Sequence, residues 1–214
     1  MKSLIVVLLL AVALPASAQL RLNGYAGYTF DDNVDSYYDN TSYYDGKIKG
    51  GFQWGVGLEF QVRPDYGIEL SYLRQDTKAP ITYYQNGVKF TEFDLGVNYI
   101  MLGGTRYFRR SGSKVEGFGG AQLGVNIFGL ENPTNGKSSD KTFFAWGLKG
   151  GMNFWASEKV AIKLQAGLLS AVQSVGGGFY FGTGGAGAGL SSYSTIYQFT
   201  LGGGIVVKIP TAAK

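Results

Sequence analysis

The segment at residues 51–62 restricts the possible folds more than any other part of the sequence. Bulky apolar side chains occupy every second position, and glycine or polar residues fill the positions between them. A helix would repeat its apolar residues every three to four positions, whereas strict alternation is typical of a β-strand with two unlike faces. The apolar set is Phe52, Trp54, Val56, Leu58, Phe60 and Val62.

The same alternation recurs in seven other segments, so the sequence predicts eight strands. These segments are residues 19–30, 67–74, 89–108, 115–128, 142–155, 160–173 and 196–209. In each of them we expect the larger apolar residues to share one face and the glycines and polar residues the other. In the fourth strand along the chain, the predicted outer set is Phe93, Leu95, Val97, Tyr99 and Met101.

The connections between these strands alternate between short and long. Residues 63–66, 109–114 and 156–159 are short turns, and residues 31–50, 75–88, 129–141 and 174–193 are long loops. An up-and-down membrane barrel has this rhythm, because its periplasmic turns are short and its extracellular loops are long. The predicted fold is therefore an all-β, closed, eight-stranded antiparallel barrel that crosses a membrane.

Residues 1–18 have the pattern of a cleavable signal peptide. Lys2 supplies a positive start, residues 4–14 form an apolar run, and residues 16–18 form a small-residue cleavage site. The apolar run is shorter than the roughly 20 residues that a membrane-spanning helix needs. We therefore expect a signal peptide at 1–18 and a single barrel domain at 19–214.

A soluble β-sandwich or a lipocalin-like barrel would also alternate apolar and polar residues. The size of the two sets favours the membrane barrel. A narrow eight-stranded barrel has little room inside, which suits glycines and paired polar groups, while bulky aromatic residues suit a lipid-facing surface. The chain has 34 glycines, 15% aromatic residues, 16% charged residues and a mean hydropathy of +0.00.

The composition argues against most catalytic chemistry. The chain contains no cysteine, so it has no disulfide and no thiolate nucleophile. It contains no histidine, so no imidazole is present to act as a base or to bind a metal. A serine with a lysine base is formally possible, but no spacing singles one out. The net charge of +4 is spread along the chain and forms no nucleic-acid patch. We expect no enzyme activity, cofactor, metal or nucleic-acid partner.

Ten charged residues are predicted to point into the barrel, with nearly balanced signs. Charges in a narrow lumen are costly unless they are paired, so we interpret them as a salt-bridged plug that closes the barrel. The alternative is a gated path for ions. The ten residues are Arg21, Glu59, Glu69, Glu92, Asp94, Arg106, Glu116, Lys149, Lys163 and Lys208.

The first long loop is rich in tyrosine and acidic residues. Its acidic residues suggest calcium, but the loop lacks the glycine and the bidentate glutamate of an EF-hand. Tyrosine offers a large contact area at low entropic cost, which favours contact with an extracellular protein or surface ligand. The candidate contact residues are Tyr37, Tyr38, Tyr43 and Tyr44.

The last long loop contains a glycine-rich segment at residues 176–187. No Walker lysine follows it and no strand-to-helix context surrounds it, which argues against phosphate binding. A flexible loop that folds over the barrel mouth is the favoured interpretation.

Two glycine-rich strand segments carry a resemblance to a known family. Residues 117–126, with the sequence GFGGAQLGVN, and residues 197–204, with YQFTLGGG, resemble the outer-membrane protein β-barrel domain superfamily of the OmpA/OmpX type and its small porin-family barrels. The resemblance covers nearly all of residues 19–214. It differs at the C-terminus, where the chain continues through residues 210–214 instead of ending on an aromatic strand residue.

This resemblance implies a place in the bacterial outer membrane, contact with outer-membrane lipids, and no catalytic residues. It implies a structural or surface-interaction role for a barrel whose lumen is closed by paired charges. The alternative is a narrow porin-like channel for ions or small solutes.

Overall fold

The computed structural model describes residues 19–39, 42–84, 88–131, 138–172, 181–182, 185–186 and 196–210. The regular elements in these ranges are all strands. They are β1 (Gln19–Thr29), β2 (Asp32–Asp39), β3 (Ser42–Ile48), β4 (Gly51–Arg63), β5 (Tyr66–Tyr84), β6 (Val88–Arg109), β7 (Val115–Glu131), β8 (Ser138–Trp155), β9 (Val160–Val172), β10 (Phe181–Gly182), β11 (Gly185–Ala186) and β12 (Ile196–Ile209). The predicted signal peptide and residues 211–214 lie outside the described ranges.

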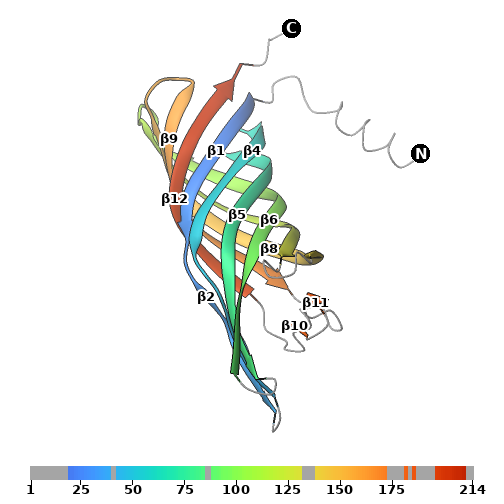
Figure 1. The fold of residues 1–214 in the computed structure, drawn as a ribbon. Helices are drawn as coiled ribbons and strands as arrows, with labels where there is room; N and C mark the ends of the chain where they lie inside the picture. The colour runs from blue at the N-terminus through green and yellow to red at the C-terminus, as the bar shows by residue number, and fades with distance from the viewer. Residues whose placement is uncertain are drawn as a thin grey trace, which may run out of the picture.

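Eight of these strands close into an antiparallel barrel, as the alternation predicts (Figure 1). Neighbours around the barrel follow the order β4, β1, β12, β9, β8, β7, β6 and β5, and β5 then pairs with β4. The first and last strands meet in a continuous register from Leu20 opposite Ile209 to Thr29 opposite Thr200. Both Gln19 and Ile209 therefore lie at the end that carries the three short turns. We call this the turn end and the opposite one the loop end.

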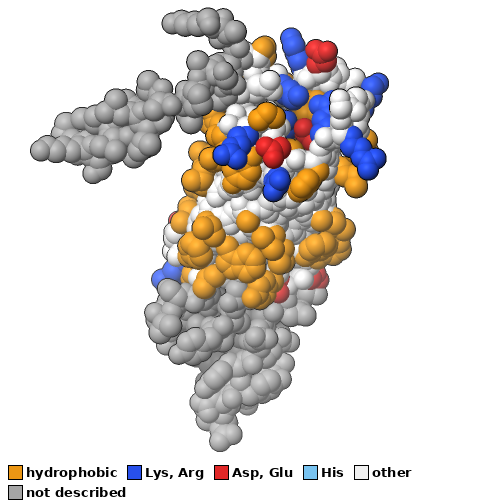
Figure 2. Space-filling model, turned by 180° about the vertical axis from the view of Figure 1, so that it is seen from behind, with side chains coloured by type: hydrophobic (Ala, Val, Ile, Leu, Met, Phe, Trp, Pro, Cys, Tyr) orange, Lys and Arg blue, Asp and Glu red, His pale blue; other side chains and the backbone are white. Residues whose placement is uncertain are grey.

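The outer face of the barrel is apolar. On the face seen in Figure 2, hydrophobic side chains form a band across the barrel, away from the charged side chains of the turn end. A soluble protein rarely exposes an apolar surface of this extent, whereas a lipid-facing barrel requires it. The exposed set includes Leu22, Tyr28, Phe30, Phe52, Trp54, Val56, Leu58, Ile68, Leu70, Leu102, Leu123, Phe144, Leu148, Met152, Ile162, Leu164, Phe199, Leu201 and Ile205.

Aromatic side chains gather toward the loop end of this band. Trp54 packs edge-on against Tyr72 with ring centroids 5.9 Å apart, and Trp146 packs in the same way on Tyr197 at 6.3 Å. Tryptophan and tyrosine are enriched at membrane–water interfaces, because their rings are apolar and their polar atoms reach water. These pairs mark one boundary of the membrane-spanning belt.

The prediction of loops at residues 31–50 and 75–88 is wrong. β5 and β6 contain 19 and 22 residues, well beyond the roughly 9–11 that cross a bilayer. The extra residues continue the β5–β6 ladder past the belt. β2 and β3 form a hairpin, and β3 of this hairpin pairs with the extended part of β5 (Figure 1). The loop end is thus a long extension of the sheet. In the glycine-rich segment, β10 and β11 form a further short hairpin.

The predicted orientation of one strand face is also wrong. Phe93, Leu95, Val97, Tyr99 and Met101 of β6 point into the barrel and are almost completely buried. Ile100 and Leu102 face outward, with 42% and 58% of their surface exposed. Alternation shows which residues share a face, but both faces of this strand are apolar near residue 100, so the pattern does not say which face is inside.

Candidate functional site: the charged lumen

The barrel interior is divided into two tiers. The tier toward the loop end is mainly apolar, and its buried residues include the inward side chains of β6 together with Phe128, Leu130, Phe143, Leu169 and Ile196. A short polar chain crosses it: Tyr99 donates a 2.8 Å hydrogen bond to Gln198, and Gln198 donates a 3.0 Å bond to Gln75. The tier toward the turn end contains the charged residues.

Glu69 of β5 is the centre of one half of this charged tier. Its carboxylate accepts a 2.8 Å hydrogen bond from Asn23 and further bonds from the Tyr25 hydroxyl and the Lys149 ammonium. Lys163 donates a 3.0 Å bond to Asn23 from the opposite side, and its ammonium lies 4.9 Å from the centre of the Tyr25 ring. One carboxylate thus connects β1, β5, β8 and β9 across the lumen.

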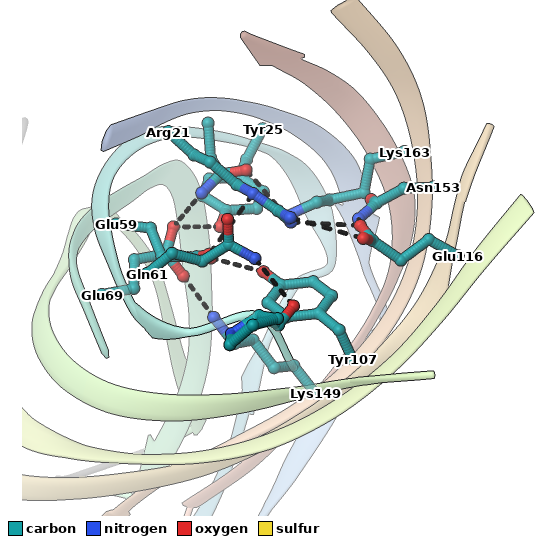
Figure 3. A network of polar contacts seen from close by, with 12 residues as sticks. Arg21, Tyr25, Glu59, Gln61, Glu69, Tyr107, Glu116, Lys149, Asn153 and Lys163 are labelled. Carbon is teal, nitrogen blue, oxygen red and sulfur yellow. Dashed lines mark hydrogen bonds and ion pairs between the residues drawn. The ribbon is translucent and has the colours of Figure 1, made fainter. Parts of the chain in front are cut away.

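Arg21 of β1 is the centre of the other half. Its two terminal nitrogens donate to the Glu116 carboxylate at 3.1 and 3.3 Å, and Asn153 adds a 3.0 Å bond to the same carboxylate. The guanidinium lies over the Tyr107 ring at 4.4 Å, and the Tyr107 hydroxyl donates a 2.5 Å bond to Glu59. Figure 3 shows both halves side by side inside the ring of strands, with dashed contacts that run across the lumen.

The charges of the network balance. Glu59, Glu69 and Glu116 face Arg21, Lys149 and Lys163, and all six side chains are buried. Each carboxylate accepts at least one hydrogen bond within the network. Buried charges are tolerated when they are paired and hydrogen-bonded in this way. The arrangement is chemically suited to cross-linking the wall and blocking the lumen.

Two glycines make room for these carboxylates. A Cβ atom on Gly57 would meet the carboxylate oxygen of Glu69, and one on Gly67 would meet the side chain of Glu59. Both glycines point inward on β4 and β5. Because these inward glycines have no side chain, they leave the space that the buried carboxylates occupy.

The structure places six of the ten predicted charges in this network: Arg21, Glu59, Glu69, Glu116, Lys149 and Lys163. Lys208 is half-buried at the turn end, 4.0 Å from the centre of the Trp155 ring. The prediction of a lumen position is wrong for Glu92, Asp94 and Arg106. Arg106 lies on the outer face at the turn end, 67% exposed and 3.9 Å from Asp65.

Glu92 and Asp94 lie in a separate ion-pair cluster on the loop-end extension. Glu92 pairs with Lys49 at 2.8 Å and with Lys78 at 3.0 Å, and Asp94 lies 3.6 Å from Lys78. Hydrogen bonds from Lys49 and Lys78 hold the pKa of Glu92 below its ordinary value. The error arises because the outward face of β6 becomes polar where the strand leaves the lipid belt, and this resembles a polar lumen in the sequence.

Sequence reasoning did not select Tyr107 and Asn153 as site residues, although both contact the charged network. For Asn153 the available signal was its place four residues from Lys149 on the same strand face. For Tyr107 there was none, because it shares the face of its strand that the pattern assigned to the outside. The four candidate tyrosines lie in the β2–β3 hairpin, where Tyr37 is opposite Tyr44 and Tyr38 is opposite Tyr43. No group of three or more acidic residues among the described residues is arranged to hold a metal ion.

Comparison with known proteins agrees with the fold. The model of the outer membrane protein beta-barrel domain family matches residues 3–100. Neisserial surface protein A (NspA) superposes with a TM-score of 0.59 at 13% identity, over 89% of this chain and 97% of that one. OprG from Pseudomonas aeruginosa gives 0.54 at 11% identity, over 90% and 96% of the two chains.

The outer membrane protease OmpT from Escherichia coli also has a similar fold, with a TM-score of 0.55 at 9% identity, over 89% of this chain and 97% of that one. No curated protein sequence matches the chain. At these identities the likeness shows a shared barrel fold. No helix in the described ranges is long and apolar enough to cross a membrane.

Proposed function

We propose that this chain is a small, closed β-barrel of the bacterial outer membrane with a structural or surface-interaction role, a proposal supported by its barrel fold and by the family model that matches residues 3–100. The observation that carries this proposal is the pair of stacked tiers in the lumen. Three carboxylates and three cations cross-link the wall in one tier, and apolar side chains pack against each other in the next. A hydrated ion would have to displace side chains in both.

The loop-end extension supports a surface role. The β2–β3 hairpin continues the sheet beyond the lipid belt and carries four tyrosine positions on two paired strands. Paired strands present residues at fixed spacing, and tyrosine is well suited to contact surfaces. We propose this hairpin as the region that meets an extracellular protein or another surface ligand.

The closed lumen is tested by conductance in planar bilayers. The purified protein should show heat-modifiable gel mobility, which establishes that it is folded, and no discrete conductance steps. Steady unitary conductance from the folded protein would contradict the closed barrel. It would support the alternative, a narrow channel, which is favoured by the polar character of the turn-end tier.

The orientation of the hairpin is tested with epitope tags on intact cells. A tag inserted at residues 40–41, between β2 and β3, should be detected without permeabilisation. A matched tag inserted in the turn between Ser111 and Gly112 should be detected only after permeabilisation. Detection of the second tag alone on intact cells would contradict the proposed role of the hairpin.

We also propose that the barrel is not an enzyme. The chain lacks cysteine and histidine, and the likeness to OmpT is one of fold at 9% identity. Incubation of the folded protein with a library of fluorogenic peptides should give no cleavage above that of the heat-unfolded protein. Cleavage by the folded form alone would contradict this proposal.

A further inference from the structure

The lumen opens at the turn end into a pocket of about 720 Å³, which we call the vestibule. Its charged lining consists of the cations Arg21, Arg63, Arg109, Arg110 and Lys208 and the acidic residues Asp65 and Glu116. The lining therefore has an excess of three positive charges. The charged network forms the floor of the vestibule, since Arg21 and Glu116 belong to both.

The two acidic residues are already engaged by other groups. Glu116 accepts hydrogen bonds from both terminal nitrogens of Arg21 and from Asn153. Asp65 lies 3.9 Å from Arg106, which is on the outer face of the barrel. Among the described residues, Arg63, Arg109, Arg110 and Lys208 therefore have no carboxylate within ion-pair distance. The positive charge of the vestibule is not neutralised from within.

Trp155 holds three of the cations together at the wall. Its ring centre lies 4.0 Å from the Lys208 ammonium, 5.4 Å from the Arg21 guanidinium and 5.9 Å from that of Arg109. An aromatic ring attracts cations and orients them, but it does not cancel their charge. Arg21 is paired with Glu116, but within the described ranges Lys208 and Arg109 have no carboxylate partner. The repulsion between these two like charges is relieved when an anion enters between them.

The turn after β6 carries a fourth cation, Arg110, and contacts Arg109. The Ser113 amide donates a 3.0 Å hydrogen bond to the Arg110 carbonyl, and Gly112 has a φ of 77°, which favours glycine. The Arg109 side chain in turn donates a 2.9 Å bond to the Ser113 carbonyl. The turn thus holds the Arg109 guanidinium in place and fixes the backbone from which the Arg110 side chain extends.

From this geometry we propose that the vestibule is a binding site for a phosphate-type oxyanion, held by Arg109, Arg110 and Lys208 above the Arg21–Glu116 pair. A guanidinium presents parallel N–H groups that match the oxygens of phosphate, and the bonds are strengthened by charge. The phosphate is supplied either as a free ion or by the headgroup of a phospholipid at the turn end. This site does not depend on whether the lumen conducts.

The test uses the full barrel domain in a non-ionic, phosphate-free detergent, titrated with inorganic phosphate. Binding is followed by ³¹P NMR line broadening and by the temperature at which the compact gel band is lost, with chloride at matched ionic strength as reference. The variants are Arg110→Gln and Lys208→Gln. The matched control is Lys141→Gln, an exposed lysine at the loop end. A second arm replaces detergent with nanodiscs of phosphatidylglycerol or of an uncharged glycolipid.

We expect saturable binding that weakens by about tenfold or more in each vestibule variant and is unchanged in Lys141→Gln. Saturation by inorganic phosphate identifies the free ion as a ligand. Stabilisation by phosphatidylglycerol nanodiscs alone, lost in the same variants, identifies the lipid headgroup. No saturable effect in either arm, an equal effect of chloride, or equal binding by the variants and the wild type would overturn the proposal.

Discussion

At the residue scale, the interior depends on where side chains are absent as much as on where they are present. Glu69 can accept bonds from Asn23, Tyr25 and Lys149 because Gly57 on the neighbouring strand leaves room for its carboxylate. Strand glycines normally weaken a sheet by roughly 0.5–1 kcal/mol relative to alanine. Here that cost is offset by the buried network that the space permits.

We predict that Gly57→Ala destabilises the barrel by about 1–3 kcal/mol, the usual cost of overpacking a filled interior. The new methyl group would displace the Glu69 carboxylate, which three hydrogen bonds hold in place. The measurement is urea unfolding in detergent or lipid, followed by tryptophan fluorescence.

The matched control is Gly119→Ala on the outer face of β7, where an added Cβ has no atom within 4 Å. This control should be neutral or slightly stabilising. If Gly57→Ala proved as stable as Gly119→Ala, the close fit between Gly57 and Glu69 would be refuted.

At the element scale, β6 shows how a strand can be identified correctly and still be oriented wrongly. Its alternation is regular, but residues 93–101 are apolar on the inward face and residues 100 and 102 are apolar on the outward one. Which face of β6 points into the barrel is decided by its pairing with the neighbouring strands β5 and β7. β5 and β7 hold β6 in a continuous register in which Tyr99 is opposite Leu73 and Asn126.

Single cysteine variants test this orientation, because the chain has no cysteine of its own. In lipid bilayers, a membrane-soluble maleimide should label Ile100→Cys and leave Val97→Cys unlabelled. Val97 is fully buried inside the barrel, whereas Ile100 is 42% exposed on the outer face.

Both variants should react fully after unfolding in urea, which controls for the reactivity of the thiols. Strong labelling of Val97→Cys together with protection of Ile100→Cys would instead restore the orientation predicted from the sequence.

At the scale of the whole molecule, the barrel depends on one seam between its first and last strands. β12 carries three consecutive glycines, residues 202–204, opposite residues 25–27 of β1. A Cβ on Gly204 would meet the backbone oxygen of Gly24, and one on Gly202 would meet that of Ala26. The backbones at the seam therefore approach more closely than side chains there would allow.

We predict that Gly204→Ala lowers the temperature at which the compact gel band converts to the unfolded one. Overpacking costs about 1–3 kcal/mol, and each kcal/mol corresponds to roughly 2–4 °C for a chain of this size. Gly119→Ala serves again as the control and should keep the wild-type conversion temperature. An unchanged temperature for Gly204→Ala would show that the seam tolerates side chains.

Much of the architecture could be predicted from the local pattern. The alternation of apolar and polar residues, the short turns and the bulky apolar side chains predicted eight antiparallel strands with an apolar outer face. These properties could be predicted because they depend on neighbours along the chain. Arg21, Glu59 and Glu69 could be assigned to the lumen for the same reason. Glu92 and Asp94 could not, because their strand continues past the lipid belt at the loop end and the sequence does not mark where the lipid ends. Arg106 could not, because it lies on the face of β6 that the pattern assigned to the lumen and that the structure places outside.

The sequence by itself determined that the chain alternates, that it closes as a barrel, and that its interior has charges to pair. Only the tertiary structure decided which charges meet, which face of β6 is inside, and that the first predicted loop is a hairpin extending the wall. Each of these depends on contacts between residues far apart in the chain, such as Arg21 with Glu116 and Lys149 with Glu69. Such contacts are fixed by the stagger of eight strands around a closed ring, which no single segment of the sequence contains.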